Sequence, residues 1–186
     1  MNRMDSAWGD QAPSLEVEKW FNTKENLTLE SLRGSVVVIE AFQMLCPGCV
    51  STGLPQAKRV ELMFKSPDVQ VIGLHSVFEH HEAQTPTSLE AFLYEYRIRF
   101  PVAVDQQGKK GRLPKTMTAY ELQGTPSLIL IDRQGRRRFQ HFGQVEDLQL
   151  GAQIMALASE EALPGSKSVA ATASKSESCD EDGCPI

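Results

Sequence analysis

The sequence predicts one α/β domain built on a mixed β-sheet with helices on both faces. Two observations support this fold class. Apolar, β-branched runs of strand length alternate along the chain with segments whose apolar residues recur at helical spacing. The last two strand-like runs are instead joined directly by DRQG at residues 132–135, which is typical of a hairpin turn. The sheet is therefore expected to have parallel central strands and an antiparallel edge pair.

Each element follows from a local pattern. Continuous β-branched runs are typical of strands buried on both faces, and apolar residues three and four apart are typical of amphipathic helices. Thr87 or Ser88 is a suitable N-cap for the second helix, and Pro55 is expected to kink the first. In chain order, the predicted elements are strand Val36–Phe42, helix Val50–Phe64, strand Val69–Leu74, helix Leu89–Tyr96, strand Phe100–Val104, a short helix or turn at Met117–Leu122, strand Ser127–Ile131, strand Arg136–Phe142 and helix Val145–Ala158.

The chain is predicted to divide into three parts. Residues 1–14 are interpreted as an N-terminal extension and residues 15–158 as a single folded domain, long enough to close a hydrophobic core. Residues 159–186 carry two lysines, six acidic residues and almost no large apolar side chains. This acidic tail is therefore expected to be disordered.

Composition and charge exclude several function classes. The formal net charge of -5 argues against binding to nucleic acid or to an anionic membrane. The N-terminus lacks the apolar region of a secretory signal, and no apolar run approaches the roughly 20 residues that span a bilayer. These observations predict a cytoplasmic protein, where stable structural disulfides are rare. The four cysteines, in two close pairs, are then expected to be redox-active or metal-binding.

The motif Cys46-Pro47-Gly48-Cys49 follows the strand Val36–Phe42 almost directly. Pro47 suits the first turn of a helix, which places Cys46 at the helix N-terminus, where unpaired N–H groups and the helix dipole stabilise a thiolate. Cys49 lies one turn later on the same side. Position therefore assigns Cys46 as the nucleophile and Cys49 as the resolving cysteine. An isolated Cys-x-x-Cys is equally compatible with a metal site or with simple packing.

Over residues 15–158 the chain resembles the thioredoxin superfamily, in particular its TlpA-like and AhpC/TSA (redoxin) branch. The resemblance is carried by VVVIEAF leading into CPGC, by VQVIGLHSV, by SLEAFLYEYRIRFPVAVD and by GTPSLILIDRQGRRR. It implies a three-layer thioredoxin-like fold with a TlpA-type helix–strand insertion. It also implies thiol–disulfide exchange that needs no bound cofactor or metal, because the cysteine pair carries the electrons. The expected partners are protein or small-molecule thiols and disulfides, and an unidentified reductase or oxidant.

The resemblance implies further site residues. Thr125-Pro126 looks like the cis-proline site of the family, which would shape a substrate groove together with Pro47 and Gly48. Glu40, six residues before the first cysteine, stands where thioredoxins place a buried acid that helps to move the proton of the resolving cysteine. A buried carboxyl has a raised pKa and exchanges its proton near neutrality. The alternative is a strand-edge glutamate that points to water.

Three other functions are kept open. A zinc site needs four ligands, of which this motif supplies two. A peroxiredoxin-like antioxidant peroxidase is disfavoured, because Gln43 and Glu40 stand where peroxiredoxins carry a threonine and a proline. A non-catalytic module would bind a partner beside Pro126 and use its cysteines only to sense redox state.

Cys179 and Cys184 form the second cysteine pair, in the acidic tail. A disulfide across Cys-x4-Cys is sterically feasible, and such a pair could relay electrons to Cys46 and Cys49 as a tethered substrate. Alternatively, these are two solvated cysteines without a redox role. The sequence leaves both hypotheses open.

Overall fold

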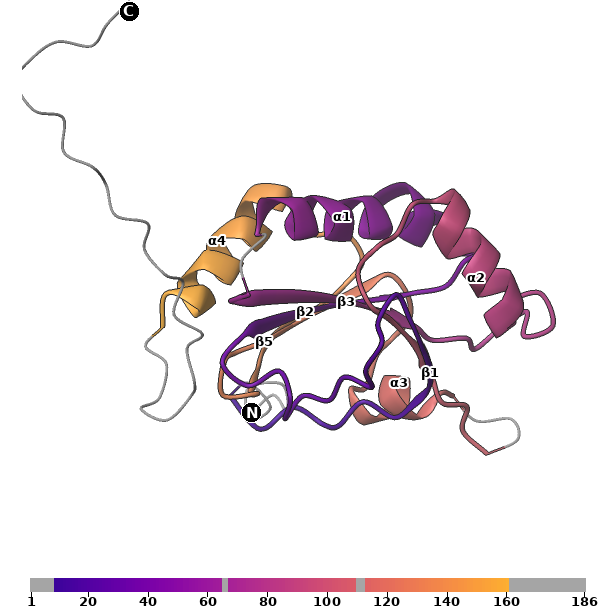
Figure 1. Cartoon of the computed structure of the whole chain (residues 1–186), viewed down its shortest axis with the longest axis horizontal. Helices are drawn as coiled ribbons and strands as arrows, with labels where there is room; N and C mark the ends of the chain where they lie inside the picture. Colours follow the sequence, from indigo (N-terminus) through magenta and orange to yellow (C-terminus); the bar gives the residue numbers. More distant parts are fainter. Residues whose placement is uncertain (1–8, 65–66, 110–112, 161–186) are drawn as a thin grey trace, which may run out of the picture.

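The computed structural model describes residues 9–64, 67–109 and 113–160, and it shows one mixed sheet between two layers of helices (Figure 1). The predicted α/β class, with a mixed sheet and helices on both of its faces, is therefore confirmed. The six strands lie in the order β1-β4-β3-β2-β5-β6. They are β1 (Val17–Phe21), β2 (Val36–Phe42), β3 (Val69–His75), β4 (Val102–Asp105), β5 (Ser127–Ile131) and β6 (Arg137–Phe142). The helices are η1 (Cys49–Gly53), α1 (Leu54–Met63), α2 (Pro86–Glu95), α3 (Lys115–Ala119) and α4 (Asp147–Ala158).

The sheet is parallel at its centre and antiparallel at both edges. β2 pairs in parallel with β3, which pairs in parallel with β4. β5 and β6 form the expected antiparallel edge beside β2. The second edge, where β1 runs antiparallel to β4, is missing from the prediction. Its sequence VEKWF is short and carries two charged residues, so pairing with the buried β4 defines this strand more than its own pattern does.

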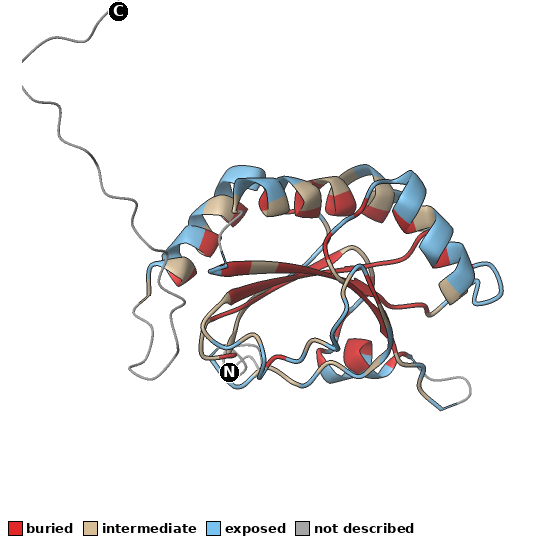
Figure 2. Cartoon of the chain, in the orientation of Figure 1, coloured by how far each residue is buried: buried red, intermediate tan, exposed pale blue. Residues whose placement is uncertain are grey.

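β2 lies at the centre of the sheet, and all seven of its residues are buried (Figure 2). Successive side chains of a strand point to opposite faces. The apolar residues at even positions join the core beneath α1, α2 and α4, and those at odd positions join the core beside α3. Glu40 has an even position, so its carboxyl points into the layer that contains η1 and α1.

The helix is irregular just before Pro55, where the sequence predicts a kink. Helical backbone runs without a break from Pro47 to Met63, and the π-helix η1 precedes α1. In η1 the Leu54 N–H reaches back five residues to the carbonyl of Cys49. Pro55 then follows as the second residue of α1. A proline has no N–H to donate, so the ordinary i→i−4 hydrogen-bond ladder is interrupted at this point of the helical run. The irregular turn therefore lies where the proline is expected to disturb the helix, and the kink angle stays a prediction.

Residues 9–13 lie along the β5–β6 hairpin. The Gly9 N–H donates to the carbonyl of Arg137, and the Ala12 N–H donates to that of Gly135. The domain start at residue 15 stays a prediction. Within the described ranges, no helix combines the length and the apolar character that a bilayer crossing requires. The cytoplasmic location also stays a prediction.

Candidate active site

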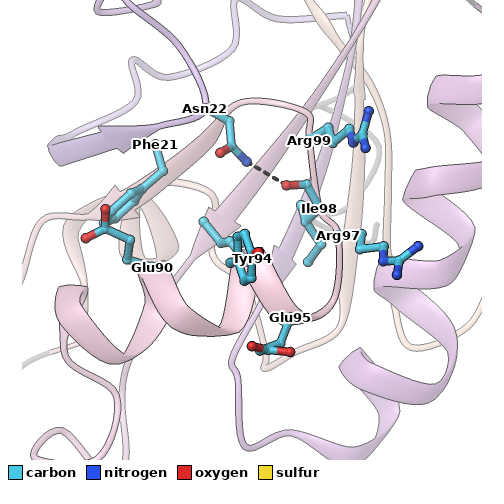
Figure 3. Close-up of a pocket in the computed structure, with 9 residues that line it drawn as sticks. Phe21, Asn22, Glu90, Tyr94, Glu95, Arg97, Ile98 and Arg99 are labelled. Carbon is cyan, nitrogen blue, oxygen red and sulfur yellow. Dashed lines mark hydrogen bonds between the residues drawn. The ribbon is translucent and has the colours of Figure 1, made fainter.

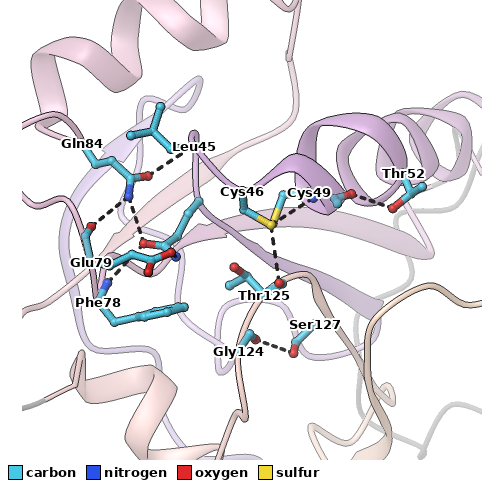
Figure 4. The surroundings of a disulfide bond; sticks show 12 residues. Leu45, Cys46, Cys49, Thr52, Phe78, Glu79, Gln84, Gly124, Thr125 and Ser127 are labelled. Carbon is cyan, nitrogen blue, oxygen red and sulfur yellow. Dashed lines mark hydrogen bonds between the residues drawn. A yellow bond between two sulfur atoms is a disulfide. The ribbon is translucent and has the colours of Figure 1, made fainter.

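Cys46 and Cys49 form a disulfide at the beginning of the helical run, beyond the end of β2 (Figure 4). Pro47 is the first helical residue, so Cys46 occupies the N-cap position. The Cys49 N–H donates to the Cys46 sulfur over 3.1 Å, which is the hydrogen bond that an N-cap side chain normally accepts. The same N–H is positioned to stabilise a thiolate at Cys46 once the disulfide is reduced.

The two sulfurs differ in their access to solvent. Cys46 is half-buried, whereas Cys49 is fully buried and belongs to the core beneath α1. A partner sulfur therefore reaches Cys46 first. Cys49, with its Cα 5.2 Å from that of Cys46, is placed to displace whatever Cys46 has bound.

The four residues expected to form a groove come together beside Cys46. The Thr125–Pro126 peptide bond is cis, as expected. The carbonyl oxygen of Thr125 lies 3.4 Å from the Cys46 sulfur. Gly48 faces the Pro126 ring so closely that an added Cβ would lie 3.4 Å from its Cδ, and Pro47 is exposed next to it. The backbone of Thr125 thus borders the sulfur that a partner must approach.

Glu40 is buried, with 2% of its surface exposed, so the strand-edge alternative is wrong. Its Oε1 has no hydrogen-bond partner among the described residues. Burial raises the pKa of this carboxyl to about 8, because desolvation penalises the charged form. Gly53, the last residue of η1, makes room for it: a Cβ there would overlap the Glu40 carboxyl and come within 3.1 Å of Pro126 Cβ. The carboxyl therefore lies beneath the π-helix that begins at Cys49.

A pair of buried glutamines fixes the segment before Cys46, and sequence reasoning missed its role. The Gln43 side-chain oxygen accepts hydrogen bonds from the Gln84 amide over 3.0 Å and from the Phe78 N–H over 3.3 Å (Figure 4). Gln84 also donates to the carbonyl of Glu79 over 3.0 Å. These bonds tie the active-site loop to residues 78–84. A glutamine in a polar loop carries no signal of burial, so only the fold reveals this contact.

Metal ligands do not gather at the site in the described part of the chain, where no three His, Cys, Asp or Glu side chains are placed to hold an ion. His75, at the end of β3, is buried against Phe42, and burial lowers its pKa to about 4. It is therefore neutral at pH 7. Cys179 and Cys184 lie outside the described residues.

Residues 8–139 match the AhpC/TSA family. Among solved structures, a thioredoxin-like superfamily protein is 58% identical to this chain with a TM-score of 0.80, and the match covers 82% of this chain and 98% of that protein. A thiol-disulfide isomerase from Corynebacterium glutamicum is 54% identical with a TM-score of 0.77, covering 81% of this chain and 98% of the isomerase.

Protein DipZ of Mycobacterium bovis is a more distant relative, 29% identical over 136 residues. That match covers 72% of this chain but 18% of DipZ. The chain thus spans about a fifth of the length of the DipZ proteins that it matches.

The buried carboxyl predicts an unusual pH dependence of stability. The Glu40 pKa is about 8 in the folded chain against 4.5 for an unperturbed glutamate, so the folded state keeps a proton that the unfolded state loses. The contribution of Glu40 to the free energy of unfolding is fully present below pH 4.5 and is lost as the pH rises to about 8. The total loss is roughly 5 kcal/mol at most. Denaturant titrations of the oxidised chain at pH 5 to 8, with and without Glu40→Gln, measure this difference.

His75 contributes with the opposite sign, because its pKa is lowered: its stability is lost as the pH falls from 6.5 to about 4. This contribution of His75 is the same in the unmodified chain and in Glu40→Gln, so it cancels when the two are compared. Glu90→Gln, at an exposed position, is the matched control. Parallel curves for the unmodified chain and Glu40→Gln would contradict the buried, protonated carboxyl.

The fit between Gly53 and Glu40 predicts an energetic coupling. Gly53→Ala is expected to lower the free energy of unfolding by about 1–3 kcal/mol, because the new methyl group overlaps the carboxyl. The same substitution should cost at least about 1 kcal/mol less when Glu40 is alanine. Gly151→Ala, in α4 with nothing within 4 Å of its Cβ, is the control and is expected to be neutral or stabilising. Equal costs in both backgrounds would show that the two residues are independent.

Proposed function

Because the chain belongs to the AhpC/TSA family of the thioredoxin-like superfamily, we propose that it is a thiol–disulfide oxidoreductase acting on protein disulfides. The observation that carries this proposal is the unequal burial of two bonded sulfurs at a helix N-terminus. Only Cys46 is open to a partner, and its sulfur accepts a backbone N–H. The similarity to a thiol-disulfide isomerase of Corynebacterium glutamicum supports the same chemistry.

The reaction begins with the reduced cysteine pair. The Cys46 thiolate attacks one sulfur of the partner disulfide, so that a Cys46–partner bond forms and the other partner sulfur leaves as a thiolate. Cys49 then loses its proton, attacks Cys46 and releases the partner. The chain ends with its own disulfide, and the partner has gained two electrons. Each step is reversible, so the same pair oxidises a dithiol when it starts as a disulfide.

Two groups assist this exchange in our proposal. Glu40 accepts the Cys49 proton, because a carboxyl with a pKa of about 8 takes up and returns protons near neutrality. The backbone of Thr125 aligns an extended partner segment, because its carbonyl lies 3.4 Å from the attacking sulfur. The partners are proteins or small molecules with thiols or disulfides. A reductase or an oxidant resets the pair.

We propose dithiol exchange rather than peroxide reduction. Gln43 occupies the position at which peroxiredoxins carry a threonine hydroxyl. Its side-chain oxygen is already bonded to Gln84 and Phe78. No hydroxyl at that position is therefore available to activate a peroxide beside Cys46.

Reduction of insulin disulfides with dithiothreitol as the electron donor tests the proposal. Cys46→Ser should bring the rate down to that of dithiothreitol alone, because the attacking thiolate is lost. The matched control is Cys179→Ser combined with Cys184→Ser, which keeps both core cysteines. In that same background, Cys49→Ser should accumulate a mixed disulfide with insulin at Cys46, detected by mass spectrometry. A non-catalytic binding module would show no turnover with any of these chains.

Peroxide consumption tests the alternative chemistry. Per thiolate, the reduced chain should consume hydrogen peroxide no faster than an unstructured peptide containing CPGC, because no hydroxyl at residue 43 assists Cys46. The assay follows peroxide loss at pH 7 with Cys46→Ser as the control. A rate far above that of the peptide, abolished by Cys46→Ser alone, would favour a peroxidase.

A further inference from the structure

A polar pocket of about 180 Å³ leads to the buried carboxyl of Glu40. Its walls are residues 51–53 of η1, Gln56 and Arg59 of α1, and Gly143 and Gln144 after β6. Glu40 lies among its lining residues, and one oxygen of that carboxyl has no hydrogen-bond partner in the described structure. The pocket has room for several water molecules, and it offers the polar partners that ordered water requires.

This pocket is separate from the surface that a partner uses. Its lining does not include Cys46, which carries the attacking sulfur, or Pro47 and Thr125, which lie next to that sulfur. A larger pocket is also separate, because it lies between α2 and the end of β1, where Asn22 donates to the carbonyl of Ile98 (Figure 3). Of these two pockets, the smaller one touches a residue of the proposed site.

The pocket is held open by named contacts. The Gln56 side chain donates to the carbonyl of Val145 and to Asp147, each over 2.7 Å, and this fixes α4 against α1. Arg59 donates to the Asp147 carboxylate over 2.8 Å and 3.0 Å at the mouth. On the inner side, Gly53 leaves the carboxyl of Glu40 uncovered, because a Cβ there would occupy its place.

We propose that this pocket is a proton port, through which Glu40 exchanges its proton with solvent while a partner covers Cys46. The inference rests on the proposed function and adds the route by which the proton of Glu40 reaches solvent. Water is the ligand of the port, and Ser51, Thr52 and Gln144 are the side chains that line its path. They are positioning residues, because they act on the reaction through Glu40.

The port completes the resolving step. When Cys49 attacks Cys46, a bond forms between their sulfurs, the bond from Cys46 to the partner breaks, and the partner leaves as a thiolate. The proton of Cys49 passes to the Glu40 carboxylate, and from there to water in the pocket. At pH 7 the carboxyl already holds a proton in about nine molecules of ten, because its pKa is about 8. Most molecules must therefore release that proton through the port before Cys49 reacts.

Few charged groups surround Glu40. From α1, Arg59 faces the pocket mouth, and the carboxylate that pairs with it is Asp147 of α4. The neighbours of Glu40 in β3 and β5 are Gly73 and Leu128, which are uncharged. The pocket residues after β6 are uncharged too, and η1 contributes one titratable group, the Cys49 sulfur. A pH dependence of the resolving step therefore reports the titration of Glu40 and Cys49.

The experiment separates the two thiol steps in the full chain carrying Cys179→Ser and Cys184→Ser. The reduced chain is mixed with dithionitrobenzoate, an aromatic disulfide whose released thiolate absorbs visible light. The first release reports the attack by Cys46, and the second reports displacement by Cys49. Ser51→Leu blocks the port with an apolar side chain at an exposed position, so folding is retained. Gln144→Leu blocks the port from the opposite wall. The matched control is Gln149→Leu, because Gln149 is exposed on α4 and lies outside the pocket.

The expected result is a change in the second release alone. Both blocking variants should raise its pH midpoint, near 8 in the unmodified chain, by about one unit, and should slow it about tenfold at pH 7. The first release should stay within about twofold of the control. Ser51→Thr, which keeps the hydroxyl, should restore the second release.

Two results would overturn the port. The second release could match that of Gln149→Leu in both blocking variants, or both releases could slow by the same factor. An unmodified chain without a first release would instead refute the proposed function, so the two failures are distinguishable.

Discussion

The whole site depends on one interaction, the hydrogen bond from the Cys49 N–H to the Cys46 sulfur at the start of a helix. Because Pro47 begins the helical run, the first backbone N–H groups face a sulfur instead of the oxygen that usually caps a helix. This geometry requires the strand before it to end at a defined place. β2 meets that requirement, because it is buried along its full length and paired on both sides.

The second constraint is the burial of an acid in the same strand. Glu40 lies among hydrophobic residues in the core layer beneath α1, and one of its oxygens has no hydrogen-bond partner among the described residues. An unsatisfied buried group costs free energy. Here the cost coincides with a raised pKa, a glycine that makes room and a polar pocket that reaches the carboxyl. In our proposal, this cost in stability supports proton transfer by Glu40.

Much of this arrangement could be predicted from the sequence because it is written in local patterns. The β-branched run before CPGC indicates a buried strand, and an acid within it is conspicuous among apolar neighbours. Non-local effects escaped prediction. β1 is a strand because β4 lies beside it, and Gly53 is required in η1 because the Glu40 carboxyl lies against it. Gln43 and Gln84 are 41 positions apart, and only folding brings their amides together.

The π-helix has a consequence for changes in chain length. An α-helical turn needs one residue fewer than a π turn, so deleting a single residue from η1 would let an ordinary α-helix continue from Pro47. The later residues of the helix would then keep nearly the same orientation towards the sheet, because a π turn takes up one extra residue within a single turn. The change would be confined to the turn that passes over Glu40, where Gly53 now makes room for the carboxyl. A single deletion within Cys49–Gly53 would therefore alter the surroundings of Glu40 while leaving α1 in register with the sheet.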